Sequence, residues 1–502
     1  MPALQDEYQA LVGALRLHAD LAAALHLLEW DQETFMPAGA IDSRARQIGA
    51  LAELLHQQQT APALLDRIDR LAASQAQLAG AQAVNVREVK WRMDRKRRLD
   101  PALVRARSVL HAQARAAWIT ARRDDDFAAL APYLTEIVAM EQHVAASIDA
   151  GRPAYDVLLE AYEPGATTAE IDALFAQLRD GLVPLVERLT ARLSGRPLST
   201  AALCGDFPID AQRQFNRAVA ERMGFDFTRG RIDEAVHPFT MTIGHDVRLT
   251  TRYDAHDLRY SLYSTIHETG HGLYEQGLDA AAYGTPIGQS CSLGIHESQS
   301  RLWENQIGRS APFWRGLLPL ARSVFPAMAD VSLDSVLLAV NDARPSLIRT
   351  EADEITYNLH IILRFELERA LLDGSLAVAD LPAAWREKMR HYLGIVPPTD
   401  RDGVLQDVHW ASGAIGYFPT YALGNIYAAQ LLRAAEAAIG PLDATLAAGD
   451  CRPLLQWLRQ CIHRLGQTHR APALIEAATG YAPTPAPLLA HLEHKLAFLE
   501  SI

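Results

Sequence analysis

One short stretch of the chain, His267-Glu268-Thr269-Gly270-His271, has the residue types and spacing of a catalytic metal site. Two residues four positions apart lie on one face of a helix, about one turn apart, so both imidazoles can reach the same ion. A glutamate next to the first histidine can then lie beside the open coordination position and take a proton from bound water. The stretch therefore predicts a zinc site with His267 and His271 as ligands and Glu268 as the base.

A catalytic zinc ion needs a third protein ligand and an open fourth position. A helical stretch shortly downstream offers His296 and Glu297, and Glu304 is a more distant option. Spacing favours Glu297 only weakly. The residue types alone therefore leave the third ligand open among these three.

Further motifs follow one another along nearly the whole chain, and with the zinc motif they resemble the carboxypeptidase Taq family of zinc metallocarboxypeptidases. An ordered series of this kind is far more specific than a lone zinc motif. The segments that carry the resemblance are Trp30-Asp31-Gln32-Glu33-Thr34-Phe35-Met36-Pro37, His237-Pro238-Phe239, Asp246-x-Arg248-x-Thr250, His267 to His271, His296-Glu297-Ser298, Ile348-Arg349-x-x-Ala352-Asp353-x-x-x-Tyr357 and Gly403-x-x-Gln406-Asp407-x-His409-Trp410.

The resemblance implies that one zinc ion is bound by His267, His271 and Glu297, with Glu268 as catalytic base and acid. It also implies a mostly helical, saddle-like fold with a deep groove, usually in a homodimer. Enzymes of this family remove single residues from free C-termini with broad specificity, commonly sparing proline, and cobalt activates several of them in place of zinc. The expected partners are therefore peptides with a free C-terminus.

Peptide hydrolysis also needs hydrogen-bond donors for the tetrahedral oxyanion, besides the metal. Tyr417, His409 and Tyr421 lie in aromatic loops interrupted by glycine and proline, which suit the rim of a pocket. We expect Tyr421 and His409 to be the catalytic donors.

An exopeptidase that acts on C-termini must bind a terminal carboxylate, for which the planar, permanently charged arginine is suited. Arg349 and Arg248 are the candidates, and His237 is a weaker candidate for the groove. Each arginine has a structural alternative. Arg349 is surrounded in the sequence by acidic residues that could pair with it, and the strand expected around Arg248 could instead bind the substrate backbone by strand addition.

Three other functions share parts of this pattern. An oligopeptidase that cuts internal bonds would keep the zinc helices and the groove but would need no carboxylate clamp. An aminopeptidase needs an acidic anchor near the zinc helix, and the only similar segment, 139–142, lies far upstream. A silent scaffold with structural zinc would not need a base, so the intact Glu268 argues against it.

The composition fits a large folded enzyme: 502 residues, of which 49% are hydrophobic and 22% charged. A formal net charge of −12 and a pI near 5.8 argue against nucleic acid as a partner. Cys204, Cys291, Cys451 and Cys461 are scattered, which is typical of reduced thiols in a cytosolic protein. With neither a signal peptide nor an apolar stretch of about 20 residues in view, we expect a cytoplasmic enzyme without a membrane partner.

Stretches rich in alanine and leucine predict a mostly helical chain. We expect one metallocarboxypeptidase unit over 1–502, in which about 1–200 form an N-terminal helical part that walls the groove. The rest, about 201–502, would bind zinc and substrate.

Several local signals locate the elements that must position the site. Thr167 and Glu170 form a capping box at the start of a helix. Alternating β-branched residues predict a hairpin over 239–252 with its turn at Gly244-His245, directly before the zinc helix. Asp254 or Asp257 can cap that helix, and Gly277 can end it.

A basic cluster also lies in the N-terminal part, at 92–98. A solvated helix face flanked by acids is favoured for it over an anion-binding patch.

Overall fold

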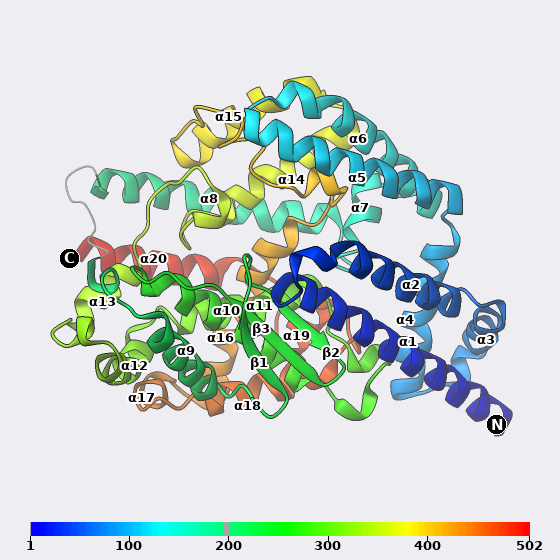
Figure 1. Ribbon diagram of the computed structural model, residues 1–502, viewed down its shortest axis with the longest axis horizontal. Coiled ribbons are helices and arrows are strands. Elements are labelled where there is room, and N and C mark those ends of the chain that lie inside the picture. Colours follow the sequence, from blue (N-terminus) through cyan, green and yellow to red (C-terminus); the bar gives the residue numbers. More distant parts are fainter. Residues whose placement is uncertain (1, 194–200, 502) are drawn as a thin grey trace.

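The computed structural model describes residues 2–193 and 201–501, in which long helices surround one small sheet (Figure 1). The predicted mostly helical fold is confirmed. The first helices are α1 (Pro2–Thr34), α2 (Ile41–Gln59), α3 (Pro62–Ala73), α4 (Gly80–Arg97), α5 (Pro101–Asp124), α6 (Phe127–Asp149), α7 (Ala154–Leu159) and α8 (Thr168–Leu193). The division predicted near residue 200 falls at the edge of 194–200, outside the described residues.

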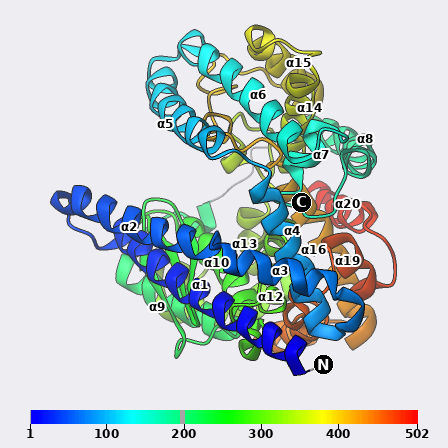
Figure 2. The ribbon, with the colours of Figure 1, turned by 90° about the vertical axis from the view of Figure 1, so that its right-hand side faces the viewer.

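The remaining helices form the second part of the chain. They are α9 (Ile209–Met223), α10 (Leu258–Gly277), α11 (Leu293–Arg301), α12 (Ala311–Val324), α13 (Leu333–Val340), α14 (Tyr357–Asp373), α15 (Leu381–Leu393), α16 (Pro419–Ile439), α17 (Asp443–Ala447), α18 (Arg452–Cys461), α19 (Ala471–Thr479) and α20 (Ala486–Ser501). In Figure 2, α5, α6, α14 and α15 form an upper group, α1, α2, α9 and α10 lie in a lower group, and α4 runs between the two.

The sheet has the strand order β1 (Gly230–Glu234), β3 (Asp246–Thr251), β2 (Thr240–Ile243). The predicted hairpin is the antiparallel pair β2 and β3, and Gly244 makes its turn with φ of +63°. The parallel neighbour β1 was not predicted, because its sequence, Gly-Arg-Ile-Asp-Glu, shows no apolar alternation. Since β3 is the central strand, the predicted strand addition at Arg248 is wrong for that strand, and only an outer strand could accept a substrate backbone.

Helix α10, which carries the zinc motif, lies between the sheet and α11. Asp257 caps its start by accepting from the Arg259 N–H at 2.9 Å, and the helix ends at Gly277. The capping box of α8 is also present, with the Thr167 N–H donating to Glu170 at 3.0 Å. These local signals were therefore read correctly from the sequence.

Two glycines let α10 approach its neighbours closely. A Cβ added at Gly272 would lie 2.7 Å from the Phe225 ring and 2.9 Å from Leu249 of β3. A Cβ added at Gly270 would lie 2.7 Å from the main chain of α11, at Gln299 O and at Ser300 Cα. The zinc helix can therefore pack directly on the sheet and on the α11 backbone only because these positions lack side chains.

Buried apolar residues form two cores. The larger one takes in most of the chain from α5 to α20. The smaller one joins α1, α3 and α4 through Tyr8, Leu11, Ile68, Leu71 and Val89, among others. Helix α4 thus packs one face into the smaller core, and its other face does not belong to that core.

Within α1, the segment Leu4–Thr34 is long and apolar enough to cross a membrane, with a mean hydropathy of 1.4 in its most apolar window, of which 6% is buried. The expectation that no stretch of the chain reaches that length and composition is therefore wrong. In the folded chain the same helix packs on α2, α3 and β2, and its residues Tyr8, Leu11 and Val12 are buried in the smaller core. These residues therefore serve the packing of the folded chain.

We expect Gly270→Ala to destabilise the protein by about 1–3 kcal/mol, the usual cost of overpacking, because the new methyl group meets main-chain atoms that cannot turn away. Equilibrium unfolding in urea measures the change. Gly13→Ala in α1 is the matched control, since no atom lies within 4 Å of its added Cβ; it should be neutral or stabilising by up to about 1 kcal/mol. Equal unfolding midpoints for wild type and Gly270→Ala would contradict the close helix crossing.

Candidate metal centre

The two histidines of the zinc motif and Glu297 come together between α10 and α11. Their ligand atoms all lie within 4.8 Å of one another. The Glu297 Oε2 lies 3.5 Å from His271 Nε2 and 3.8 Å from His267 Nε2. Two imidazole nitrogens and one carboxylate oxygen that converge in this way match the protein ligands of a catalytic zinc site.

The far atoms of all three residues are held by neighbours. Glu304 accepts from His267 Nδ1 at 2.8 Å, and Arg301 donates to Glu297 Oε1 at 2.6 Å. The Nδ1 of His296 lies 2.6 Å from the Nδ1 of His271. These contacts leave each Nε2 and one Glu297 oxygen facing the common point, so the residues present fit a metal ion.

The structure therefore separates the three candidates for the third ligand. Glu297 faces the two Nε2 atoms, whereas His296 and Glu304 lie behind the histidines. The His296 Nε2 lies 2.9 Å from Glu275, which fixes its ring in turn. Glu304 reaches His267 from a π-helical turn, Leu302–Ile307, that continues α11.

At His271 and Glu297 the electrostatics favour the protonation states that metal binding requires, whereas at His267 the Glu297 and Glu304 carboxylates raise the pKa despite burial. Burial lowers the pKa of His271 to about 4, so its imidazole is neutral at pH 7. Burial alone would raise the pKa of Glu297, but the Arg301 guanidinium holds it well below its usual value. A neutral imidazole and an ionised carboxylate are thus available together.

Two elements fix α11 and, through it, Glu297. Ser292 caps α11 by accepting from the Ile295 N–H at 3.1 Å, and the buried Glu163 accepts from the Gly294 N–H at 3.0 Å. Helix α16 packs on the other side, where a Cβ added at Gly424 would lie 2.5 Å from Glu297 Cγ. Glu297 therefore packs directly on the α16 backbone, on a helix whose start is fixed by Ser292 and Glu163.

The predicted base, Glu268, is buried beside the two histidines with 6% of its surface exposed. Its Oε2 accepts from Thr240 Oγ1 of β2 at 2.6 Å. Burial raises the pKa of this carboxyl group. The sequence analysis missed Thr240, although the residue lies in the predicted hairpin and its polar side chain was a possible signal.

The two predicted oxyanion donors lie together. His409 Nε2 is 3.4 Å from Tyr421 OH, and the Tyr417 ring packs on that of Tyr421 with centroids 5.4 Å apart. Tyr421 precedes Gly424 by three residues in α16, so it lies on the face of the helix that meets Glu297. Burial lowers the pKa of His409 to about 4, which leaves its ring neutral at pH 7.

Arg349 is buried next to these residues, with its guanidinium 5.0 Å from the centroid of the Tyr421 ring. It donates to Asp407 Oδ1 at 2.8 and 3.0 Å, and Arg364 bonds the other oxygen of the same carboxylate at 2.8 Å. The expected salt bridge thus exists, but with a distant residue. The sequence analysis missed Asp407 and Arg364, and only the quoted motif around Asp407 could have pointed to that residue.

The other two predicted substrate residues lie outside this cluster. Arg248 of β3 pairs with Asp246 at 2.7 Å and stacks over the Trp30 ring at 4.1 Å. It thereby attaches the end of α1 to the sheet. His237 is exposed in the loop between β1 and β2, three residues before Thr240.

Comparisons with known proteins agree with this geometry. A model of the carboxypeptidase Taq (M32) metallopeptidase family matches residues 11–496. Thermostable carboxypeptidase 1 of Thermus thermophilus is 45% identical over 505 residues, with 98% of each chain covered. The crystal structure of the M32 carboxypeptidase from Deinococcus radiodurans R1 superposes with a TM-score of 0.95 at 41% identity, over 99% of this chain and 100% of that one. Trypanosoma cruzi metallocarboxypeptidase 1 gives 0.94 at 33% identity, over 98% and 99%.

We expect Glu297→Ala to lose its metal ion, because one of three ligands is gone. Glu304→Gln should keep an ion with affinity or activity lowered by about 10- to 100-fold, as is usual when the partner of a ligating histidine is changed. Metal content after dialysis, and titration against a competing chelator, measure both effects. The exposed Glu351→Gln is the control and should bind like wild type. A Glu297→Ala protein that retains one tightly bound ion would show that the ligand lies elsewhere.

Proposed function

The chain belongs to the carboxypeptidase Taq (M32) family and is a metallocarboxypeptidase that hydrolyses peptides, and we propose that zinc is its metal, that Glu268 is its general base and that its specificity is broad. The observation that supports this best is the convergence of His267 Nε2, His271 Nε2 and Glu297 Oε2, with Glu268 next in the chain. Two imidazoles and a carboxylate with an open fourth position are the ligand set of catalytic zinc, which cobalt could also occupy.

When bound, a zinc ion would supply a Lewis acid and lower the pKa of a coordinated water molecule toward about 7. Glu268, buried next in the chain to His267, would hold the proton lost by the attacking water. It can then deliver the proton to the nitrogen of the leaving amino acid. Thr240 orients the carboxylate by donating to its Oε2, so the sheet helps to position the base.

Tyr421 and His409 are proposed to stabilise the oxyanion of the tetrahedral intermediate. Both are neutral donors at pH 7, since burial raises the pKa of Tyr421 well above its usual value and lowers that of His409. Donors that are already fixed before the reaction stabilise developing charge at no cost of reorganisation. The packing of His409 against the Phe418 ring, with centroids 4.5 Å apart, and the helix position of Tyr421 provide that fixation.

Arg349 is proposed to bind the terminal carboxylate of the substrate. The cluster of Arg349, Arg364 and Asp407 carries two positive charges and one negative charge, so it keeps a surplus of one positive charge. A substrate carboxylate would neutralise that surplus. Arg248 is less suited to this role, because its pair with Asp246 leaves no surplus charge. His237 remains a proposed substrate contact at the exposed loop before β2.

We also propose an oligomeric state and a cellular location. The homodimer rests on the family resemblance. A cytoplasmic location is supported by the four free cysteines among the described residues, which suit a reducing compartment.

We expect Glu268→Gln to keep its metal ion while turnover falls by at least about 100-fold, the usual size of a general-base contribution. The amide keeps the shape and the contact with Thr240 but cannot accept a proton. Metal content and kcat on a blocked dipeptide are measured on the same preparation. Turnover close to wild type in the fully metallated variant would exclude Glu268 as the base.

The proposed role of Arg349 predicts that kcat/KM is higher for a peptide with a free C-terminus than for the same peptide with a C-terminal amide. The amide lacks the charge and one acceptor oxygen, and such a mismatch with a buried cation costs about 2–5 kcal/mol, or roughly 30-fold to several thousand-fold in kcat/KM. Arg349→Ala should lose most of this preference and Arg349→Lys should recover part of it, since ammonium lacks the planar fork.

The measurement is kcat/KM for matched acid and amide peptides, with Arg248→Ala as the control that should still discriminate. Equal cleavage of both peptides by wild type, with cuts at internal bonds, would favour the oligopeptidase alternative. Strong discrimination by Arg349→Ala would place the clamp at another residue.

A further inference from the structure

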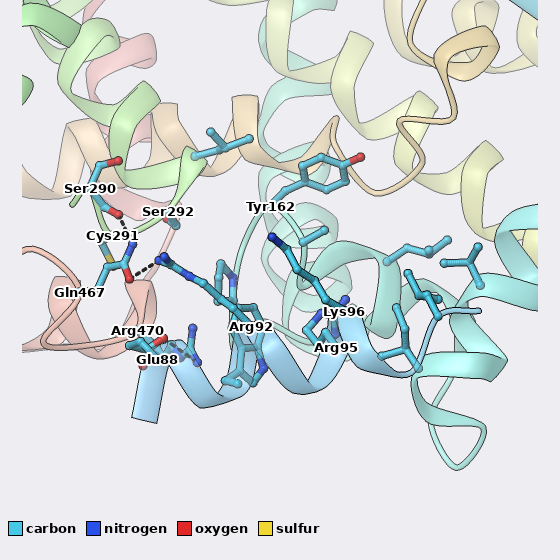
Figure 3. A pocket seen from close by; sticks show the side chains of 18 of the residues that line it. Glu88, Arg92, Arg95, Lys96, Tyr162, Ser290, Cys291, Ser292, Gln467 and Arg470 are labelled. Carbon is cyan, nitrogen blue, oxygen red and sulfur yellow. Dashed lines mark hydrogen bonds and ion pairs between the residues drawn. The ribbon is translucent and has the colours of Figure 1, made fainter. Parts of the chain in front are cut away.

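A cavity of about 560 Å³ lies between α4 and the segment that leads into α11 (Figure 3). Five of its lining side chains are cationic and only one, Glu88, is anionic. The cations are Arg92, Arg95, Lys96, Arg107 and Arg470. Its volume is within the range of small-molecule and peptide side-chain sites. The cavity is therefore a basic pocket in a protein whose net charge is −12.

The basic wall is one face of α4. The pocket is lined at 88, 91, 92, 95, 96 and 99, which follow one another at helical spacing. The opposite face carries Val86 and Val89 into the smaller core. The cluster at 92–98 is thus not simply a solvated face flanked by acids: Arg92, Arg95 and Lys96 line a cavity, with Lys96 also exposed to solvent.

Three of the five cations are already paired with carboxylates. Arg95 pairs with Glu160 at 3.0 Å, Arg107 with Glu141 at 2.7 Å and Arg470 with Glu88 at 3.1 Å. These carboxylates neutralise the charges of three lining cations. The other two cations, Arg92 and Lys96, have no such partner among the described residues.

Arg92 and Lys96, one turn apart on α4, form no ion pair with any residue in 2–193 or 201–501. Arg92 donates to the neutral side chains of Gln289, at 2.8 Å, and Gln467, while Lys96 donates to Gln59 at 3.0 Å. In Figure 3, Arg92 extends toward Gln467 and Lys96 extends toward Tyr162. Burial lowers the pKa of Arg92, although the Glu88 carboxylate opposes this shift, and burial together with the charge of Arg92 lowers the pKa of Lys96. Two neighbouring cations thus line the pocket without a direct ion pair to any described residue, and the lining carboxylate, Glu88, already pairs with Arg470.

The pocket is connected to the metal centre through its far wall. The Leu293 N–H donates to Tyr162 O at 3.2 Å, and the Tyr162 ring packs on Tyr417 with centroids 5.1 Å apart. Leu293 starts α11, and Glu297 follows it after four residues, or about 6 Å along the helix axis. An extended peptide covers that distance with about two residues. Leu293 of the pocket lining thus lies within the length of about two extended residues of Glu297.

We propose that Arg92 and Lys96 form a subsite for the side-chain carboxylate of an acidic residue located on the N-terminal side of the scissile bond. The proposal rests on the carboxypeptidase function. The terminal carboxylate is assigned to Arg349, so the second carboxylate that the pocket can accept belongs to a side chain. The subsite would make acidic peptides preferred substrates at one position, within an otherwise broad specificity.

The test uses N-acetylated peptides with one common C-terminal residue and either Glu or Gln at each of the three preceding positions. Glu and Gln have nearly the same shape, so their ratio of kcat/KM isolates the charge. At one position wild type should favour Glu by about 10-fold, the size of a net hydrogen bond to a charged group, and the preference should shrink at high salt. Lys96→Gln and Arg92→Gln should each lose most of it while cutting the Gln peptides nearly as well as wild type.

Lys96→Gln is the sharper variant because its one recorded partner is Gln59, whereas Arg92 also joins Gln289 and Gln467 and its loss can loosen the fold. Lys96→Glu should reverse the preference. Arg97→Gln is the matched control: it removes the next cation of the helix, which does not line the pocket and pairs with Asp69 at 2.9 Å, and it should retain the preference.

Cleavage of the neutral Gln peptides by wild type reports the carboxypeptidase function separately from the subsite. Equal rates for Glu and Gln at all three positions would overturn the proposal. It would also be overturned by a preference that persists in both variants, or by Lys96→Gln losing the discrimination between acid and amide termini instead. That last result would assign the terminal carboxylate to this pocket.

Discussion

The metal centre depends on the distance at which α10 and α11 cross. The two histidines lie on one helix and the third ligand on the other, and their ligand atoms fall within 4.8 Å of one another. This is possible because α10 presents Gly270, without a side chain, to the backbone of α11. Gly424 of α16 does the same on the opposite side of Glu297. Two glycines from different helices thus determine the position of Glu297, the proposed third ligand, and a side chain at either position would move it.

The charged side chains around this crossing are paired with one another. Arg301 bonds both Glu297 and Glu304, and Glu304 in turn orients His267. Leaving a buried charge without its partner usually costs several kcal/mol, so such a network restricts each group to one position. The same holds for Asp407 between Arg349 and Arg364, except that this group retains a net positive charge. The compensated network holds the proposed metal ligands, and the uncompensated one is available for an anionic substrate.

Sequence reasoning succeeded where the determining contacts are local. The spacing of His267 and His271, the cap at Asp257 and the hairpin of β2 and β3 all depend on residues close in the chain, and the structure has each of them. Features that depend on contacts between residues far apart in the chain could not be predicted in this way. Spacing could not separate Glu297 from His296, the sequence of β1 gave no strand pattern, and the pairing of Arg349 with Asp407 spans 58 residues. The family resemblance indicated Glu297, but the physical reason for it lies in the packing of three helices.

The acidic composition argued against nucleic acid as a partner, but it could not indicate a basic pocket, because the pocket also depends on contacts made by the fold. A net charge of −12 averages over the whole surface, whereas a bound group responds to charges within about a Debye length, roughly 8–10 Å. Helix α4 concentrates three cations on its inward face because its other face is needed for the smaller core. Low-dielectric walls then strengthen their field inside the cavity relative to water. An acidic protein can therefore present positive potential at the positions where a peptide binds, and its total charge keeps polyanions away from the rest of its surface.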